Sequence, residues 1–441
     1  YDIAPKRSKD EIIKIPDPNF KRYLINYFDT DGDGEISIAE ALGIKEIHCK
    51  KQGIKSLKGI EAFENLVKLT CSFNDLCDLD ISQLKKLTYL DCQHNRLIYL
   101  DLSGNKLLRI CWCDHNVIER LDVSKNIELY KLNCQNNVLK TLNVRRNKKL
   151  FRLDCADNKL TSLNLTKNPE LEQLRCFRNR LWKLDVSKNP LLQYLIADGN
   201  NLVSLDTSLN PDLISLFCAM NTLNSIDTSK NRKLRYLSCH DNNLTSLNVT
   251  NNKKLLILNI ADNKLSDIDV RGCKNLTRLD ITRNNIETLN ITQNLKLWWL
   301  FCESNKLSSL NLMNNRKLAK LFCGCNTLSS LDLSNNLEQK TLDCRFNKLR
   351  QLEFAKNLKI RIVECNGNYL EKLDISTNTE LIKIVCAANC LENIDVSCNK
   401  KLKLLCCDRN VSLYFGDNKM RLDDPTNEDG VFLLPYICYY R

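Results

Sequence analysis

Residues 132–152 read LNCQNNVLKTLNVRRNKKLFR, and residues 153–173 read LDCADNKLTSLNLTKNPELEQ. The two stretches align without a gap, because leucine, cysteine and asparagine return at the same places. Beyond them an asparagine stands at every 21st position from Asn74 to Asn410, seventeen times in all. A strict period of about 20 to 29 residues predicts one structural unit stacked on itself, with each turn touching only its neighbours.

Each turn carries an inward pair of apolar residues. A leucine column contains Leu132 and Leu153, and two residues later a cysteine follows in fourteen of the seventeen turns. The other three turns have Ala197, Ile260 and Ile281 there. Positions two apart on a strand share a face, so both columns point into the core. The replacements indicate that the site takes a small buried hydrophobe and does not require sulfur.

The chain has twenty-three cysteines, a number that raises the question of a disulfide framework. Fourteen of them are expected on parallel strands in register, about 4.8 Å apart, whereas the Cβ atoms of a disulfide lie about 3.8 Å apart. We therefore expect a ladder of free, buried thiols. A bridge stays open among four cysteines outside the ladder that could be partly exposed, Cys325, Cys390, Cys398 and Cys406.

The asparagine after each cysteine marks the corner where the strand ends. Its amide can both donate and accept, so it is expected to satisfy backbone groups that the stacked loop would otherwise bury without partners. A second asparagine column, with Asn147 and Asn168, lies ten residues further on. The apolar spacing in this second half is two, which favours extended backbone on the convex side instead of a helix.

The charge and hydropathy of the chain limit its partners. The formal net charge is +12, but the basic residues are scattered through every repeat, which is typical of a solvated surface; we expect no nucleic-acid partner. No apolar run reaches the roughly 18 residues of a membrane span. The chain begins at Tyr1 without a methionine or signal segment, as expected of a mature or trimmed form. A membrane link is expected only through an anchor outside this chain.

The first residues predict a helical cap with an acidic loop. Residues 18–28 should form a helix with Asp17 as its N-cap and Pro18 at the first helical position. The loop that follows fits the calcium pattern D-x-[DN]-x-[DN]-G-x5-E, which surrounds a hard cation with oxygen ligands. The alternatives are a structural calcium and a metal-free cap, and no other cofactor is expected. The candidate ligands are Asp29, Asp31, Asp33, Glu35 and Glu40.

Aromatic side chains are concentrated beside the inward pair, where they should face out from the concave sheet. Aromatics are 7% of the chain, so this enrichment indicates a binding surface, although stacking that stiffens the sheet is the alternative. Charged residues surround the rings: Arg152, Arg175, Arg178, Asp198, Asp241, Arg278, Asp280, Arg283 and Glu303. The candidate ligand-binding residues are Tyr89, Trp112, Phe177, Tyr194, Phe217, Tyr236, Trp299, Phe301 and Phe322.

Histidines offer little basis for catalysis. His94 and His115 share one column on adjacent turns and should stack about 5 Å apart. A metal site there would need further ligands, with Asp91 and Asp114 as the nearest candidates. The fourteen ladder thiols are buried and therefore unsuited to catalysis. We expect no enzymatic activity.

The repeat L-x-x-L-x-C-x-x-N-x-L-x-x-L-D-L-x-x-N resembles the bacterial 21-residue leucine-rich repeats of the internalin J-like, cysteine-ladder type. The resemblance implies a solenoid of about eighteen turns with a parallel concave sheet and an extended convex side. The N-terminal helix and acidic loop resemble the caps of Bacteroidetes repeat proteins. We expect a tail and cap at 1–46, the repeat array at 47–413 and a C-terminal cap at 414–441.

The resemblance also implies a function without naming a ligand, because the family binds unrelated partners with one scaffold. The leading hypothesis is an exported, adhesin-like bacterial protein, extracellular or on the cell surface, that engages a host or neighbouring-cell protein or glycan. A passive surface spacer without a specific ligand is one alternative. An intracellular effector is the other, because its thiols would be unpaired.

Overall fold

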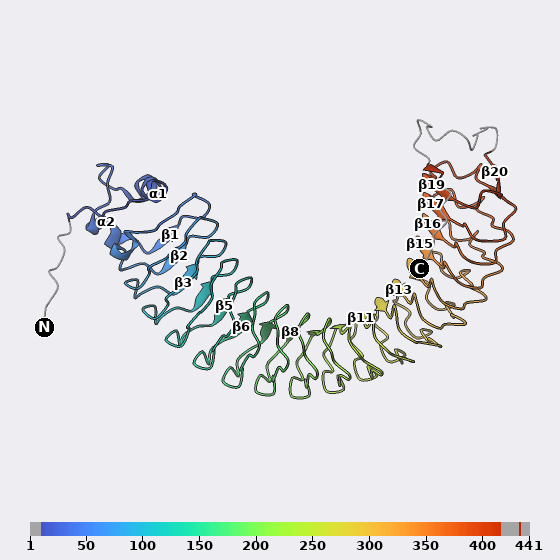
Figure 1. Ribbon diagram of the computed structural model, residues 1–441, viewed down its shortest axis with the longest axis horizontal. Helices are drawn as coiled ribbons and strands as arrows, with labels where there is room; N and C mark the ends of the chain where they lie inside the picture. The colour runs from blue at the N-terminus through green and yellow to red at the C-terminus, as the bar shows by residue number, and fades with distance from the viewer. Residues whose placement is uncertain (1–9, 416–431, 434–441) are drawn as a thin grey trace. The chain divides into compact units, whose positions relative to one another are not determined.

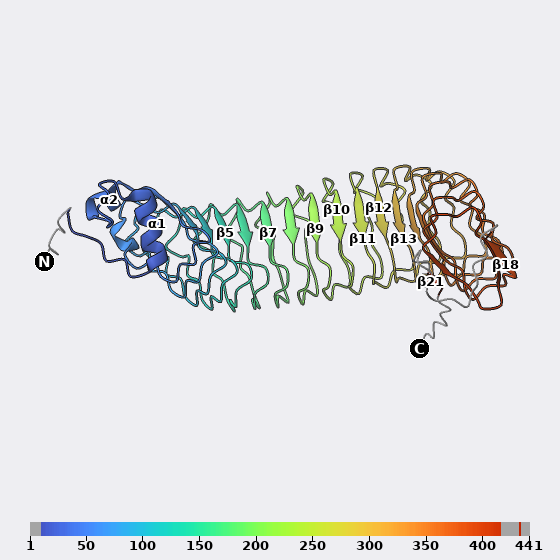
Figure 2. The ribbon, with the colours of Figure 1, turned by 90° about the horizontal axis from the view of Figure 1, so that it is seen from above.

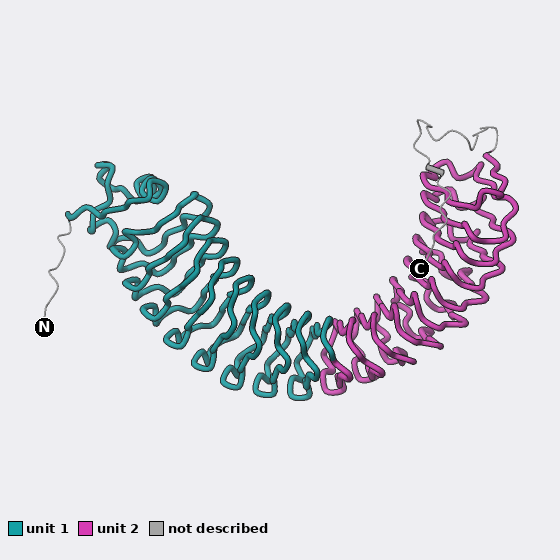
Figure 3. Tube along the Cα trace, in the orientation of Figure 1, with its two compact units in different colours: residues 1–222 teal, residues 223–441 magenta. Residues whose placement is uncertain are grey.

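The computed structural model describes residues 10–415 and the backbone of residues 432–433. The chain falls into two compact units, residues 1–222 and residues 223–441 (Figure 3). Each unit is a stack of turns with one short strand per turn (Figure 1). Residues 1–9 and nearly all of the predicted C-terminal cap at 414–441 lie outside the described residues.

Unit 1 stacks nine strands in chain order, each paired in parallel with the next. In Figure 2 the arrows of β5, β7 and β9 lie in one row and point the same way. Paired residues are 21 positions apart from β2 onward, so the sequence period is the strand register. The strands are β1 (Glu46–His48), β2 (Lys68–Thr70), β3 (Tyr89–Asp91), β4 (Ile110–Trp112), β5 (Lys131–Asn133), β6 (Arg152–Asp154), β7 (Gln173–Arg175), β8 (Tyr194–Ile196) and β9 (Ser215–Phe217).

Unit 2 repeats this parallel register. A separate parallel pair, β18 with β20, forms on the return half of its last turns, and β21 pairs with β19. The strand of each turn, from β1 to β17 and in β19, confirms the predicted solenoid of about eighteen turns. The strands are β10 (Tyr236–Ser238), β11 (Ile257–Asn259), β12 (Arg278–Asp280), β13 (Trp299–Phe301), β14 (Lys320–Phe322), β15 (Thr341–Asp343), β16 (Ile362–Glu364), β17 (Lys383–Val385), β18 (Asn393–Asp395), β19 (Leu404–Cys406), β20 (Ser412–Tyr414) and β21 (Phe432–Leu433).

The leucine and cysteine columns form the core of each unit. Leu153 and Cys155 are fully buried, and burial holds the pKa of the Cys155 thiol well above its usual range because a thiolate would lose its hydration. Every cysteine among the described residues is free, as predicted for the ladder. The prediction that Cys406 is partly exposed is wrong, because this cysteine is buried. The other three cysteines of that prediction, Cys325, Cys390 and Cys398, are exposed.

The first asparagine column joins neighbouring turns through its side chains. The Nδ2 atom of Asn137 donates to the carbonyl oxygens of Cys113 and Cys134, both at 3.1 Å. Its Oδ1 accepts from the N–H of Ile118 at 2.9 Å. The amide therefore satisfies buried backbone groups on two turns, as the sequence predicts.

The residue before this asparagine adopts the left-handed conformation. His94 and His115 have φ values of 50° and 53°, and the same column holds other non-glycine residues with positive φ along both units. The conformation lets each N–H bond the following turn: the N–H of His94 donates to the carbonyl oxygen of Asp114 at 2.9 Å. A hydrogen bond per turn thus offsets a backbone strain of about 1 kcal/mol or more.

The return half of each turn is extended, with isolated bridges such as Asp122 to Asn143. Asn147 shows how an asparagine of this column uses only the donor half of its amide, whereas Asn252 also accepts from the Thr228 hydroxyl at 2.8 Å. The Nδ2 atom of Asn147 donates to the carbonyl oxygens of Val123 at 2.9 Å and Asn126 at 2.8 Å, whereas its Oδ1 is buried without a hydrogen-bond partner. The η1 segment (Ile60–Ala62) is the helical element of the described array residues, and it spans three residues.

Two helices lie at the β1 end of unit 1, α1 (Pro18–Phe28) and α2 (Ile38–Gly43) (Figure 1). Asp17 caps α1, as predicted: its Oδ1 accepts from the N–H groups of Asn19 and Phe20, both at 2.9 Å. Its Oδ2 accepts from the N–H groups of Lys55 at 2.8 Å and Ser56 at 3.1 Å. One carboxylate therefore caps the helix and holds it against the first turn.

Candidate binding surface on the sheet

The predicted ring residues occupy three positions of the turn. Tyr89, Tyr194, Tyr236 and Trp299 start a strand, Trp112, Phe217, Phe301 and Phe322 end one, and Phe177 follows the ladder cysteine. Their side chains flank the inward leucine–cysteine pair, and the rings are half-buried, apart from Tyr194, which is more exposed. The structure brings some of them together and leaves others apart.

The densest group lies in unit 2, over β13 and β14. We call Trp298, Trp299, Phe301 and Phe322 the Trp299 cluster. The rings of Phe301 and Phe322 stack with centroids 4.9 Å apart, and Trp299 meets Phe301 edge-on at 6.4 Å. Trp298, which is 50% exposed, stacks on Trp299 with centroids 5.3 Å apart. Four rings on adjacent strands thus form one continuous apolar surface.

Two cations flank the Trp299 cluster. The Arg278 guanidinium lies 5.4 Å from the Trp299 ring centroid and 5.1 Å from that of Phe301. The Lys320 Nζ lies 4.5 Å from the Trp299 ring on the opposite neighbouring strand. Two donors here have no partner: Trp299 Nε1 and Arg278 Nε are both buried without a hydrogen bond.

Carboxylates gather around Arg345 beside these rings. The Arg345 guanidinium lies 3.2 Å from Asp343, 3.4 Å from Glu364 and 3.5 Å from Glu303. Burial, reinforced by Asp343, raises the pKa of Glu303, and burial raises that of Asp343. The surface therefore combines rings, cations and partly desolvated acids, a mixture common in protein interfaces.

Unit 1 carries smaller aromatic groups. Tyr89 meets Trp112 edge-on with centroids 5.5 Å apart. Phe177 lies beneath two guanidinium groups, with Arg175 at 5.5 Å and Arg178 at 5.9 Å from its ring centroid. These contacts keep the rings on the sheet face but do not join them into a surface as large as the Trp299 cluster.

Three predicted residues stand apart. Within residues 10–415, the rings of Tyr194, Phe217 and Tyr236 make no contact with another aromatic ring. Four further residues of the sheet face were not predicted from the sequence. They are Trp298 and Lys320 of unit 2, and the stacked pair Tyr130 and Phe151 of unit 1, whose ring centroids lie 4.9 Å apart. Trp298, Tyr130 and Phe151 share the column just before the strand, so an alignment of that column would have grouped them.

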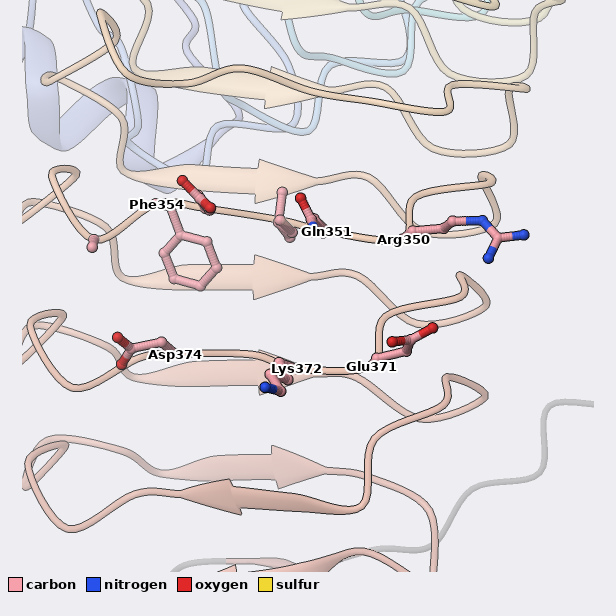
Figure 4. A pocket seen from close by; sticks show the side chains of 9 residues that line it. Arg350, Gln351, Phe354, Glu371, Lys372 and Asp374 are labelled. Atoms are coloured by element: carbon pink, nitrogen blue, oxygen red, sulfur yellow. The ribbon is translucent and has the colours of Figure 1, made fainter.

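Two hollows among the described residues lie away from these rings. One of about 540 Å³ opens between two return segments of unit 2, where Figure 4 shows Arg350 and Phe354 on one turn and Lys372 and Asp374 on the next. A second, of about 690 Å³, is lined in unit 1 mostly by basic side chains, Arg145 among them. None of the predicted ring residues lines either hollow. The aromatic rings of the sheet face are therefore a better candidate for partner recognition than either hollow.

The predicted calcium loop brings Asp29, Asp31 and Glu40 together, with one oxygen of each within 4.8 Å of the others. Glu40, however, already uses both oxygens. Its Oε1 accepts from the Thr30 N–H and hydroxyl, and its Oε2 from the Ser37 N–H and hydroxyl. These four bonds favour a structural role for Glu40 in closing the loop. Asp33 and Glu35 lie outside the group: Asp33 accepts from the Glu35 N–H, and Glu35 pairs with Lys21.

The stacked turns and their side-chain ladders define a leucine-rich-repeat solenoid fold. The functional domain of InlJ from Listeria monocytogenes, whose structure includes a cysteine ladder, is similar to this chain. The two are 28% identical with a TM-score of 0.66, and the match covers 90% of this chain and 80% of that domain. The predicted cysteine-ladder architecture is thereby confirmed. The Bacteroidetes-style origin of the cap stays a prediction.

Two further structures share the fold. A leucine-rich-repeat protein of Leptospira interrogans has 19% identity and a TM-score of 0.62, covering 85% of this chain and 92% of that one. A plant peptide hormone receptor, RGFR1, solved in complex with RGF2, has 20% identity and a TM-score of 0.73, covering 84% and 67%. No family model and no curated protein matches the sequence. Across the described residues, no helix is long and apolar enough to cross a membrane.

Proposed function

We propose that this chain is an exported, non-enzymatic bacterial binding protein, adhesin-like in role, that engages a protein partner through the Trp299 cluster. The observation that supports the proposal is the group of four touching rings, flanked by Arg278 and Lys320, with the Trp299 Nε1 buried and unpaired. Touching aromatic rings that are flanked by arginine supply the residue types that dominate binding energy at protein interfaces.

A protein fits this surface better than a glycan. Trp299 stands between two cations, Arg278 on one neighbouring strand and Lys320 on the other, and the acids around Arg345 begin beside Phe322. A folded protein or peptide can present apolar, acidic and basic groups in the same segment, whereas a neutral glycan has no acidic group to complement Arg278 and Lys320. A scaffold of this fold can serve a peptide ligand, since RGFR1 is a receptor for a plant peptide hormone.

The proposal can be tested with a random-peptide phage library selected on the whole chain. Peptides enriched on the wild-type protein should lose at least about thirtyfold in affinity for the W299A/F301A/F322A variant, because truncating one hot-spot residue costs about 2 kcal/mol or more. Lys320→Glu, which changes one charge and removes no ring, should weaken acidic-peptide binding in the same direction. Circular dichroism must show that both variants fold.

Trp182→Ala is the matched control, since Trp182 is 61% exposed on a return segment, away from the sheet. It should leave peptide affinity unchanged. Equal peptide binding by the wild type and by the folded triple variant would refute the placement of the site. Selective binding on a glycan array, lost in the triple variant, would keep the site and refute the choice of a protein partner.

A further inference from the structure

Two histidines of unit 1 are held face to face at the edge of the sheet. The rings of His94 and His115 stack with centroids 4.0 Å apart and planes 18° from parallel. Both residues adopt the left-handed backbone conformation on adjacent turns, so the fold itself sets their separation. His94 also stacks on Phe73, with centroids 4.1 Å apart.

A buried carboxylate joins the pair. Asp114 is 4% exposed, and its Oδ2 lies 2.9 Å from Nδ1 of His115. Its Oδ1 accepts from Nδ2 of Asn133 at 2.8 Å, which fixes the orientation of the carboxylate. One donor atom from each of His94, Asp114 and His115 lies within 4.8 Å of the other two. Asp91, the other ligand that the sequence suggested, is outside this group and accepts from the Ser72 hydroxyl.

We propose that His94, His115 and Asp114 bind a divalent transition-metal ion. Metal–donor bonds of about 2.1 Å place adjacent donors of an octahedral ion roughly 3.0 Å apart and opposite donors roughly 4.2 Å apart. The separation of Asp114 from His115 matches the first distance. The other separations in the group are at most 4.8 Å, close to the second distance.

The donor set decides the class of metal. Two imidazoles and one carboxylate suit zinc, nickel, cobalt or copper, whereas calcium and magnesium take oxygen ligands. The nearby ladder thiols do not compete, because Cys92 and Cys113 are fully buried and point into the core. Three protein ligands leave coordination positions for water or for a group of a bound partner.

The test is a titration of the whole purified chain with Co²⁺, followed by its visible absorption and by calorimetry. The wild type should bind one equivalent with imidazole and carboxylate ligation. The H94F/H115F variant keeps two stackable rings in the column of Phe73 but removes the nitrogens, and it should lose that equivalent. Asp114→Asn should weaken binding by about tenfold or more.

His240→Ala is the control, since His240 bonds Ser238 in unit 2 at 2.9 Å. It should bind Co²⁺ as the wild type does. Three outcomes would overturn the proposal: no Co²⁺ bound by the wild type, which would leave the histidines as a stack only; unchanged binding by the folded H94F/H115F variant; or a thiolate charge-transfer band, which would place the ion on exposed cysteines.

Discussion

At the scale of single residues, the two asparagine columns look alike in sequence but do different work. Asn137 donates to backbone carbonyls and also accepts from the N–H of Ile118. Asn147 only donates, and its Oδ1 is buried without a partner. Asn137 therefore satisfies groups of both kinds, whereas Asn147 satisfies carbonyls and adds an unpaired acceptor of its own.

This asymmetry predicts unequal effects of alanine. Asn137→Ala leaves the Ile118 N–H without a partner, whereas the carbonyls of Cys113 and Cys134 still accept from the neighbouring asparagines Asn116 and Asn158. Asn147→Ala leaves no such group, because its two carbonyl acceptors keep backbone N–H partners, and it removes the unpaired Oδ1. We expect Asn137→Ala to be the more destabilising of the two by roughly 1–3 kcal/mol, the free-energy cost of one buried unpaired group. The urea midpoints of the two variants, measured side by side, check the order. Equal midpoints would contradict it.

A natural replacement supports the donor-only role. Cys273 stands where the second column expects asparagine, and its Sγ donates toward the carbonyl oxygens of Val249 at 3.6 Å and Asn252 at 3.8 Å. These acceptors correspond to the ones that asparagine uses on other turns. A thiol can replace the amide here because only a donor is needed. The sequence placed Cys273 outside the ladder but could not show this role, which depends on the direction of the side chain.

The burial of each cysteine predicts whether its thiol can be alkylated in the native protein. Burial raises the pKa of Cys239 to about 12 and leaves no access to reagent, so the ladder cysteines other than the half-buried Cys407 should react with iodoacetamide only after unfolding. The exposed cysteines should react in the native protein, and peptide mass spectrometry identifies which have done so. Rapid native labelling of Cys239 would contradict the buried ladder. The expected early-reacting set is Cys77, Cys325, Cys390 and Cys398.

At the scale of elements, two carboxylates organise the N-terminal cap. Asp17 connects α1 to the first turn, and Glu40 connects the acidic loop to the start of α2 in a capping box with Ser37. Burial opposes ionisation of Glu40, but the hydrogen bonds from Ser37 and Thr30 outweigh it and lower its pKa to about 2. The cap is therefore stabilised by the charged form of an acid.

The lowered pKa of Glu40 determines how the stability of the cap changes with pH. Because the folded pKa of Glu40 lies below its usual value of 4.5, its stabilising contribution is present above that pH and is lost as the pH falls towards 2. Glu40→Gln should lower the melting temperature of the cap at neutral pH, and the difference from the wild type should shrink towards pH 2. Hydrogen exchange of the α1 amides, resolved by mass spectrometry of peptides, reports the transition. A difference that stays constant with pH would refute the role of the charge.

The melting temperature of the cap also distinguishes a calcium-bound acidic loop from a metal-free one. With both Glu40 oxygens already accepting hydrogen bonds, we expect chelation of calcium by EDTA to leave the melting temperature of the cap unchanged. A calcium-dependent rise that Glu40→Gln abolishes would show instead that the loop rearranges to bind the ion. Asp75→Asn, in the repeat array, serves as a control for a general effect of removing one carboxylate.

Strands, ladders and the α1 cap were predictable from sequence because each repeated position has the same neighbours on every turn. The position of a leucine such as Leu153 thus fixes its environment. The Trp299 cluster was only partly predictable. Phe301 and Phe322 follow from their shared column, but the roles of Trp298 and Lys320 depend on side-chain rotamers across neighbouring strands, which no period encodes. The group around Arg345 was missed for the same reason.

At the scale of the whole molecule, stability accumulates turn by turn. Each strand pairs only with the strands of adjacent turns, and each ladder bond joins neighbouring turns. Removing one whole turn therefore restores the same contacts between the turns on either side. Removing a different number of residues shifts inward side chains to the outer face.

A pair of deletions tests this modularity in unit 1. Deleting residues 147–167 removes 21 positions and joins Arg146 to Asn168, so the chain should fold with a melting temperature within a few degrees of the wild type. Deleting residues 138–157 removes 20 positions and breaks the register between the first asparagine column and the following strand. We expect that variant to melt at clearly lower temperature or to aggregate. Circular dichroism melts compare the two, and equal melting would contradict the modular account.

The thiol ladder has a consequence for where this protein can fold. Since none of the described cysteines is cross-linked, acquisition of the native state consumes no oxidant and gains nothing from one. The same chain can reach its structure in a reducing cytoplasm or after transfer to an oxidising exterior, without a partner enzyme to pair its sulfurs. Its architecture is thus indifferent to the redox potential of its surroundings, and oxidation of the buried ladder thiols becomes a hazard only for molecules that have already unfolded.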